Sequence, residues 1–209
     1  MPGIVLWDVD TQVDFMLPTG KLYVPGADET SPAMRRLVDA ARAAEIIHVA
    51  SADDHELTDP EISNRPDFRN TYPPHCLRGT RGAQKIPETE QADPLPLSLI
   101  PFPPGLIPEL ISGRREILLL KKNFNVFTNP NTDPLLEALD PAEIIVFGVA
   151  TDVCDDAAIR GLLLRGRRVR FVEDAARGLD EERVQACVAV WRAAGVEFTT
   201  AEEVVSSLV

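Results

Sequence analysis

Short apolar stretches alternate along most of the chain with longer stretches in which apolar residues recur at helical spacing. The first kind predicts buried strands and the second predicts amphipathic helices. Strands are expected near residues 4–9, 46–50, 116–120, 143–148, 168–172 and 196–198, and helices near 29–44, 131–139, 153–165, 181–194 and 200–207. Alternating strands and helices form parallel βαβ units. The pattern therefore predicts an α/β fold: a single-domain, doubly wound, mostly parallel sheet with helices on both faces.

Residues 87–108 interrupt this alternation. The segment is rich in proline, yet leucine, isoleucine and phenylalanine are interspersed in it. It is too apolar for a free linker, because exposed linkers are polar or glycine-rich. We therefore expect one domain over residues 1–209, with a Pro-rich insertion at about 87–108. This insertion is expected to pack either as a lid over the functional site or against another subunit.

Composition and charge restrict the class of protein. The 209 residues suffice for one domain with a large core, and the formal net charge is -12. This charge opposes binding to nucleic acid or to anionic membranes, which require basic surfaces. There is no apolar run that could cross a bilayer, no signal-peptide pattern and no paired cysteine framework. We expect a cytoplasmic protein with reduced thiols and with neither a nucleic-acid nor a membrane partner.

Cys154 lies where the strand predicted at 143–148 is followed by a helix. A thiol in the first turn of a helix meets unpaired backbone N–H groups and the positive end of the helix dipole, which favour the thiolate. The alternative is a buried structural cysteine, the commoner role of an isolated cysteine. Complementary chemistry at two other strand ends favours a nucleophile.

Asp10 follows the first strand, and Lys121 and Lys122 follow the strand at 116–120. Side chains at the carboxyl ends of parallel strands lie in the crevice where open α/β sheets bind ligands. Asp10 is therefore a candidate general base. A lysine beside it would keep a carboxylate and a thiolate charged and would stabilise developing negative charge. The alternative is an exposed basic pair that ends the strand.

These segments resemble a known family. The stretch Asp10-Thr-Gln-Val-Asp-Phe15, Lys121, and the stretch Gly148-Val-Ala-Thr-Asp-Val-Cys154 are similar to the Asp/Lys/Cys signature of the isochorismatase-like cysteine hydrolases, which include nicotinamidases. The resemblance extends over nearly the whole chain and implies the isochorismatase-like hydrolase fold. It implies catalytic roles for Asp10, Lys121 and Cys154, since the lysine of many members lies six residues before a phenylalanine, here Phe127.

The resemblance also implies an oxyanion hole formed by the N–H groups of Ala150 and Cys154. Family members orient the first of these groups with a cis peptide, which here would join Val149 and Ala150. Asp155 and Asp156 depart from the family pattern, in which an uncharged residue often follows the nucleophile. They would raise the pKa of Cys154 if they point inward, or they face solvent or a cationic substrate.

A second group of residues suggests a metal. Asp53 and His55 follow the strand at 46–50, and His75 lies further along in an aromatic-Pro-x-His-Cys-x-x-Gly-Thr segment. A carboxylate and two imidazoles suit a divalent ion such as zinc, iron or manganese, although such residues also occur in ordinary polar loops. The pattern resembles the metal site of nicotinamidases, which implies zinc first, iron or manganese otherwise, and a fourth ligand near Glu61.

Five further residues have either a functional or a packing interpretation. Phe15 and Tyr72 either flank an aromatic substrate ring or belong to the core. We interpret His48, Cys76 and Cys187 as core residues, because His48 lies within a strand and Cys187 lies on the apolar face of a helix.

The resemblance implies an amidohydrolase that converts nicotinamide, or a similar aromatic carboxamide, to the acid and ammonia through a cysteine thioester. A divalent metal would orient this small-molecule amide substrate. The resemblance also implies a homo-oligomer, because hydrolases of this family are commonly oligomeric. The first alternative is a related hydrolase acting on another amide or an N-carbamoyl compound. The second is a non-catalytic ligand-binding module, which the joint presence of Asp10, Lys121 and Cys154 disfavours.

Overall fold

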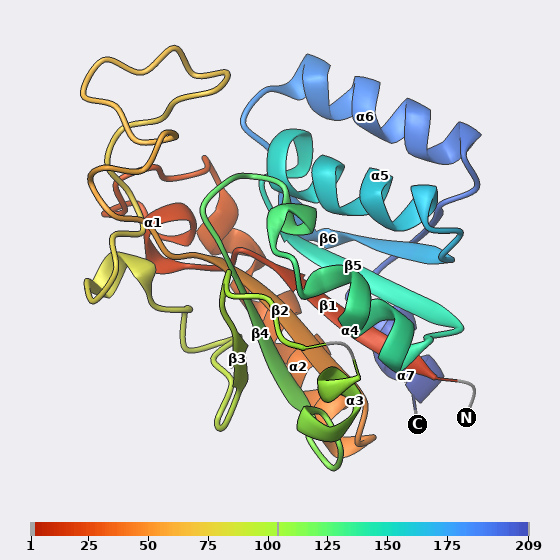
Figure 1. Ribbon diagram of the computed structural model, residues 1–209. Helices are drawn as coiled ribbons and strands as arrows, with labels where there is room; N and C mark the ends of the chain where they lie inside the picture. Colours follow the sequence, from red (N-terminus) through yellow and green to blue (C-terminus); the bar gives the residue numbers. More distant parts are fainter. Residues whose placement is uncertain (1–2, 104, 209) are drawn as a thin grey trace.

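A computed structural model describes residues 3–103 and 105–208, which are arranged around one sheet of seven parallel strands (Figure 1). The order across the sheet is β3-β4-β2-β1-β5-β6-β7. The strands are β1 (Ile4–Val9), β2 (Ile47–Asp53), β3 (Leu95–Leu97), β4 (Glu116–Lys121), β5 (Glu143–Val149), β6 (Val169–Arg177) and β7 (Glu197–Thr199). The predicted α/β class with a doubly wound parallel sheet is confirmed.

The helices are α1 (Val13–Met16), α2 (Ser31–Ala43), α3 (Leu106–Leu110), α4 (Thr132–Leu139), α5 (Asp156–Leu164), α6 (Glu181–Ala193) and α7 (Ala201–Leu208). Single 3₁₀ turns occupy residues 27–30, 81–83 and 126–128, and residues 151–155 form one π-helical turn. No helix within the described ranges has the length and apolar character that a membrane crossing requires.

Helices cover both faces of the sheet, so successive side chains of a central strand enter two different cores. Ile144 and Val146 of β5 pack with residues of α4, α5 and α6, whereas Ile145 and Phe147 pack with residues of α2 and α7. Because both faces are buried, the central strands read as continuous apolar runs rather than as alternating ones.

The Pro-rich segment adds strand β3 to the edge of the sheet, beside β4. Leu97 is buried in the core, and the side-chain amide of Asn129 donates to the carbonyl oxygens of Leu97 (2.8 Å) and Leu120 (2.7 Å). The described residues of 87–108 do not line the pocket at Cys154, so the expectation of a lid over the site is wrong for them. Contact with another subunit stays a prediction.

The order in which strands are added to the sheet reverses at β1, which lies between β2 and β5. The chain adds β2, β4 and β3 on one side and β5, β6 and β7 on the other. Ligands of open α/β sheets bind at such a switch point, outside the carboxyl ends of the strands. Strand β2 continues to Asp53, beyond the predicted end at residue 50, because Asp53 still pairs with Lys121 of β4.

Candidate active site

The ends of four strands bring Asp10, Asp53, Lys121 and Cys154 together. The Lys121 ammonium lies 2.8 Å from Oδ2 of Asp10, 2.5 Å from Oδ1 of Asp53 and 4.0 Å from Sγ of Cys154. Its side chain is fully buried. The structure therefore places the three predicted catalytic residues around one buried cation. Lys122 points elsewhere and contacts Asp59 at 2.8 Å.

Burial and charge act in opposite directions on this cluster. Burial opposes the charge of Lys121, but Asp10 and Asp53 outweigh it and raise the pKa of the ammonium well above its usual range. Burial raises the pKa of Asp10 despite the attraction of Lys121. Burial also opposes ionisation of Asp53, but Lys121 and the two imidazoles outweigh it and lower the pKa of that carboxyl well below its usual range. Asp10 is thus the better proton acceptor of the two carboxylates.

The expectation that Cys154 favours its thiolate is wrong for this structure. Cys154 is only 8% exposed and lies in the π-helical turn before α5. Burial, with the nearby Asp10 and Asp53, raises the pKa of the thiol well above its usual value, against the attraction of Lys121. The loss of hydration outweighs the helix terminus, so the thiol needs a base to become a nucleophile. The peptide between Val149 and Ala150 is cis, as expected.

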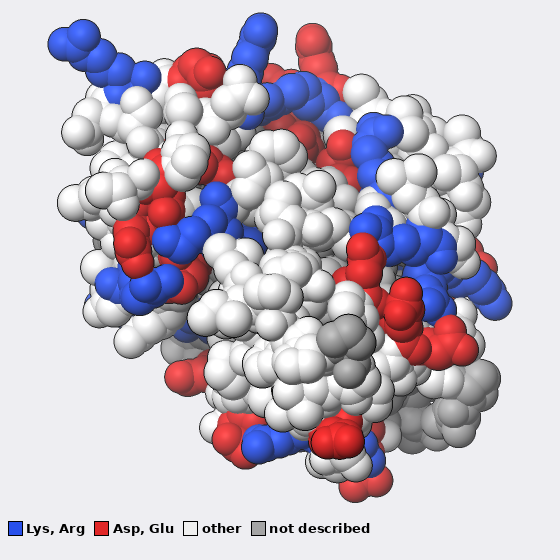
Figure 2. All heavy atoms as spheres, viewed as in Figure 1, with Lys and Arg blue, Asp and Glu red and all other residues white. Residues whose placement is uncertain are grey.

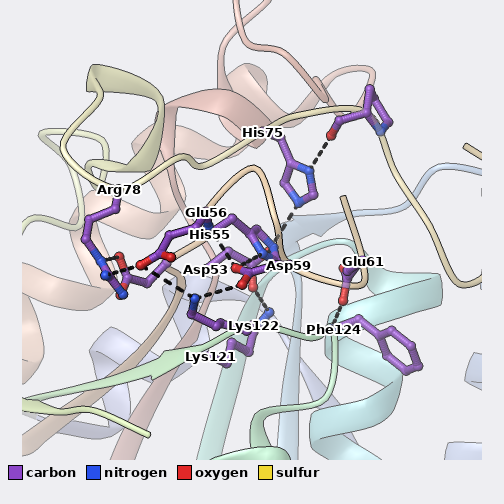
Figure 3. A network of polar contacts seen from close by, with 12 residues as sticks. Asp53, His55, Glu56, Asp59, Glu61, His75, Arg78, Lys121, Lys122 and Phe124 are labelled. Atoms are coloured by element: carbon purple, nitrogen blue, oxygen red, sulfur yellow. Dashed lines mark hydrogen bonds and ion pairs between the residues drawn. The ribbon is translucent and has the colours of Figure 1, made fainter. Parts of the chain in front are cut away.

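Asp53, His55 and His75 form the candidate metal site (Figure 3). Their ligand atoms lie within 4.8 Å of one another, and all three residues are buried. Nε2 of His55 and Nε2 of His75 lie 3.7 Å and 3.6 Å from Oδ2 of Asp53. Both ring nitrogens of His55 lack a hydrogen-bond partner among the described residues. A buried imidazole that makes no hydrogen bond and lies beside a carboxylate fits a divalent ion, because the ion can bind the lone pair of the ring nitrogen.

The pocket in front of Cys154 is mostly apolar. It is lined by Phe15, Leu22, Val24, Asp53, Glu61, Tyr72, His75, Phe124, Val149, Ala150, Val153, Cys154 and Leu179. The ring centroids of Phe15 and Tyr72 lie 5.3 Å and 6.2 Å from that of His75, so both aromatics face the candidate metal site. Glu61 lines the pocket but accepts a hydrogen bond from the N–H of Phe124 at 3.2 Å. It stands outside the three-residue cluster, and its role as a ligand stays a prediction.

The family of the chain follows from its sequence, which matches the Isochorismatase domain over residues 4–203. The chain belongs to the Isochorismatase family. A curated relative, the nicotinamidase/pyrazinamidase of Mycobacterium tuberculosis, is 29% identical over 195 residues, which cover 91% of this chain and 95% of the relative. The family match and this relative together support a hydrolase that acts on amides.

Solved structures share the fold of this Isochorismatase-family chain. A pyrazinamidase of Pyrococcus horikoshii in complex with zinc superposes with a TM-score of 0.74 at 21% identity, covering 95% of this chain and 99% of its own. An N-carbamoylsarcosine amidase from Thermoplasma acidophilum superposes with a TM-score of 0.72 at 21% identity, covering 96% and 97%.

Three polar residues that support the site in this Isochorismatase-family chain were not predicted from the sequence. Ser51 donates to Oδ1 of Asp10 at 2.7 Å. The side-chain amide of Gln12 donates to the carbonyl oxygen of Asp53 at 2.8 Å and accepts from its N–H at 2.7 Å. Asp59 lies 3.4 Å from Nδ1 of His55. A signal existed for Ser51, since it precedes Asp53 by two residues and therefore shares its face of β2.

The two aspartates after Cys154 differ in environment. Asp155 points inward and is fully buried, and neither of its carboxyl oxygens has a hydrogen-bond partner among the described residues. Asp156 accepts hydrogen bonds from Arg160 (2.7 Å) and from the Trp191 indole (2.8 Å). Neither lines the pocket in front of Cys154, so the expected role in contacting a cationic substrate is not supported there.

Proposed function

We propose that this protein hydrolyses nicotinamide, or a similar aromatic carboxamide, to the acid and ammonia through a thioester on Cys154. The observation that carries the proposal is the position of the Lys121 ammonium. It lies between Asp10, at 2.8 Å, and the Cys154 sulfur, at 4.0 Å, and it also contacts Asp53 of the candidate metal site at 2.5 Å. One buried cation thus connects a base, a nucleophile and a possible metal ligand.

In the proposed reaction Asp10 accepts the proton of the Cys154 thiol, and the sulfur forms a bond to the carboxamide carbon. The raised pKa of Asp10 suits this step, because a general base works best when its pKa lies closer to the working pH. The oxygen of the carboxamide becomes negative and is held by the N–H groups of Ala150 and Cys154. Lys121 stabilises the negative charge that moves between Asp10 and the sulfur.

The carbon–nitrogen bond then breaks, and the leaving nitrogen takes the proton from Asp10 to depart as ammonia. Asp10, now a carboxylate again, removes a proton from a water molecule that attacks the thioester carbon. The carbon–sulfur bond breaks, the acid product leaves, and the sulfur recovers its proton from Asp10.

Asp53, His55 and His75 would hold a divalent ion, with Glu61 as a possible fourth ligand. A bound ion would supply a Lewis-acid site to which the ring nitrogen of nicotinamide could bind. The zinc in the pyrazinamidase of similar fold supports zinc as the first choice, with iron or manganese as alternatives that fit the same ligands. Phe15 and Tyr72 would flank the ring, and each such contact contributes about 0.5–1.5 kcal/mol beyond area burial.

A second candidate function is hydrolysis of another amide or of an N-carbamoyl compound, which the fold of the N-carbamoylsarcosine amidase supports. The pocket disfavours it. The described residues that line it include no arginine or lysine to pair with a substrate carboxylate, and Leu22, Val24 and Leu179 suit a flat apolar ring. A non-catalytic binding module is the third candidate, and the contacts of Lys121 disfavour it.

The test is ammonia release from nicotinamide by metal-loaded protein. We expect Cys154→Ala and His55→Ala to lose the activity. Cys187→Ala is the matched control, because it removes an equally buried thiol remote from the pocket and should leave turnover unchanged. Turnover of other amides only would favour the second candidate. Tight ligand binding without turnover would favour the third.

We also propose that the enzyme works in the cytoplasm as a homo-oligomer. Its three cysteines are free, which suits a reducing compartment. Exposed apolar side chains such as Leu164 and Phe68 offer surface for subunit contacts. Sedimentation of the purified protein tests the oligomeric state, and a monomer at micromolar concentration would contradict it.

A further inference from the structure

Asp59 contacts a different ring nitrogen of His55 from the one that faces Asp53. Its Oδ2 lies 3.4 Å from Nδ1 of His55 and accepts a hydrogen bond from the N–H of Glu56 at 2.8 Å. Its Oδ1 accepts a hydrogen bond from the Lys122 ammonium at 2.8 Å. Figure 3 shows this chain of contacts running from the lysine through the carboxylate to the imidazole. The carboxylate is therefore anchored at both oxygens.

The second imidazole is supported in a similar way. Nδ1 of His75 lies 2.7 Å from the carbonyl oxygen of Pro73. In both rings Nδ1 faces an oxygen acceptor and Nε2 faces Asp53. A proton on Nδ1 leaves Nε2 with a free lone pair, so each acceptor selects the tautomer that can bind a metal through Nε2.

The two acceptor groups, the Pro73 carbonyl and the Asp59 carboxylate, are held in position by different means. The Pro73 carbonyl belongs to the backbone, whereas Asp59 is a side chain that could rotate away. Lys122 and the Glu56 N–H prevent this rotation by binding one oxygen each. The two adjacent lysines at the end of β4 thus contact different carboxylates. Lys121 contacts Asp10 and Asp53, whereas Lys122 contacts Asp59.

We propose that Asp59, anchored by Lys122, is a positioning residue that holds His55 in the tautomer and orientation needed to bind the metal. The inference rests on the metal site of the proposed function. It adds that the affinity of this chain for its ion depends on a carboxylate that does not touch the ion. Loss of such an outer partner typically weakens metal binding about 10–100-fold.

The experiment measures the zinc dissociation constant of the full chain by competition with a chelator. We expect Asp59→Ala to weaken zinc binding about 10–100-fold. Asp59→Asn should lose less, because its amide oxygen can still face Nδ1 of His55, and Lys122→Met should lie between the native protein and Asp59→Ala. Glu56→Gln is the matched control. It removes a carboxylate 3.9 Å from Lys122 that has no contact with either imidazole among the described residues, so affinity should not change.

A second measurement reports on the ring itself. Nitrogen-15 chemical shifts of His55 in the metal-free protein should show one tautomer, protonated at Nδ1, and Asp59→Ala should show a mixture of both. If Asp59→Ala fails to fold, Asp59→Asn and Lys122→Met carry the test. Native protein that does not bind zinc would overturn the metal site. Native protein that binds zinc no better than Asp59→Ala would overturn only the role of Asp59.

Discussion

Residues of the same type differ in their chemistry in this protein because their surroundings differ. Cys154 lies in the pocket beside Lys121, whereas Cys187 of α6 packs in the hydrophobic core. Asp155 is buried with no hydrogen-bond partner among the described residues, whereas its neighbour Asp156 binds Arg160. At this scale solvation and the nearest charge decide whether a side chain reacts, is held neutral or forms an ion pair.

The buried carboxyl of Asp155 predicts how stability changes with pH. Burial, and then the charge of Asp10, raise its pKa well above the usual value. Between the unfolded pKa of about 3.9 and this raised pKa, the folded protein keeps a proton that the unfolded chain loses. The free energy of unfolding therefore falls as pH rises through this range, and Asp155→Asn removes that loss.

We expect Asp155→Asn to gain stability over the native protein from about pH 4 upward. The difference should grow by at most about 1.4 kcal/mol per pH unit. Urea denaturation at a series of pH values measures it. Asp156→Asn, which changes the neighbouring carboxyl that binds Arg160, is the matched control for an Asp→Asn substitution. A difference for Asp155→Asn that is constant with pH would contradict the neutral, buried state of this carboxyl.

At the scale of elements, the parallel sheet concentrates chemistry at one edge. Strands β1, β2, β4 and β5 are adjacent and point the same way, so the residues at their carboxyl ends converge. Strand β3 has a different role. It extends the sheet beyond β4, and Asn129 joins the two strands through their carbonyl oxygens.

Asn129→Ala tests this role of the edge strand. It removes the donors to the carbonyl oxygens of Leu97 and Leu120, and a buried acceptor left unsatisfied costs about 1–3 kcal/mol. We expect a loss of that size in the free energy of unfolding, with faster hydrogen exchange at residues 95–99. Asn125→Ala, which removes a capping contact to Phe127 in a partly buried turn, should leave exchange at β3 unchanged. Unchanged exchange in Asn129→Ala would contradict the tether.

At the scale of the whole molecule, charge at the surface and charge in the interior have different roles. Figure 2 shows acidic and basic side chains interspersed over one face, although the net charge is -12. The negative charge that matters for function lies inside, where Asp10 and Asp53 are balanced by Lys121 and, in the proposed function, by a metal ion.

Metal removal should lower the stability of the whole molecule. Asp53, His55 and His75 meet only in the folded chain, so a zinc ion held by them, as proposed, would bind the folded state. At a free zinc concentration 100-fold above the dissociation constant, the gain is about 2.7 kcal/mol, and each kcal/mol raises the Tm of a protein of this size by about 2–4 °C. Thermal denaturation with zinc and with a chelator should therefore differ by roughly 5–10 °C.

His75→Ala should lose this difference, whereas Cys154→Ala should keep it, because the thiol is not a member of the metal cluster. An equal difference in His75→Ala and the native protein would place the zinc elsewhere on the chain.

The sequence alone was sufficient for the α/β class and for most strands and helices, because periodicity of apolar residues depends on local backbone geometry. It missed β3, since Pro96 lies between the two leucines of the strand and an edge strand tolerates a proline that a central strand would not. It also named the residues that converge at Lys121, through motifs at strand ends.

Only the tertiary structure decided which neighbours those residues meet. Ser51 and Gln12 support the site through contacts between segments distant along the chain, and the sequence does not say which residues those contacts join. The protonation of Cys154 also depended on the fold. The helix terminus predicted a thiolate, but burial favours the thiol, and burial is a property of the packed molecule rather than of any one segment.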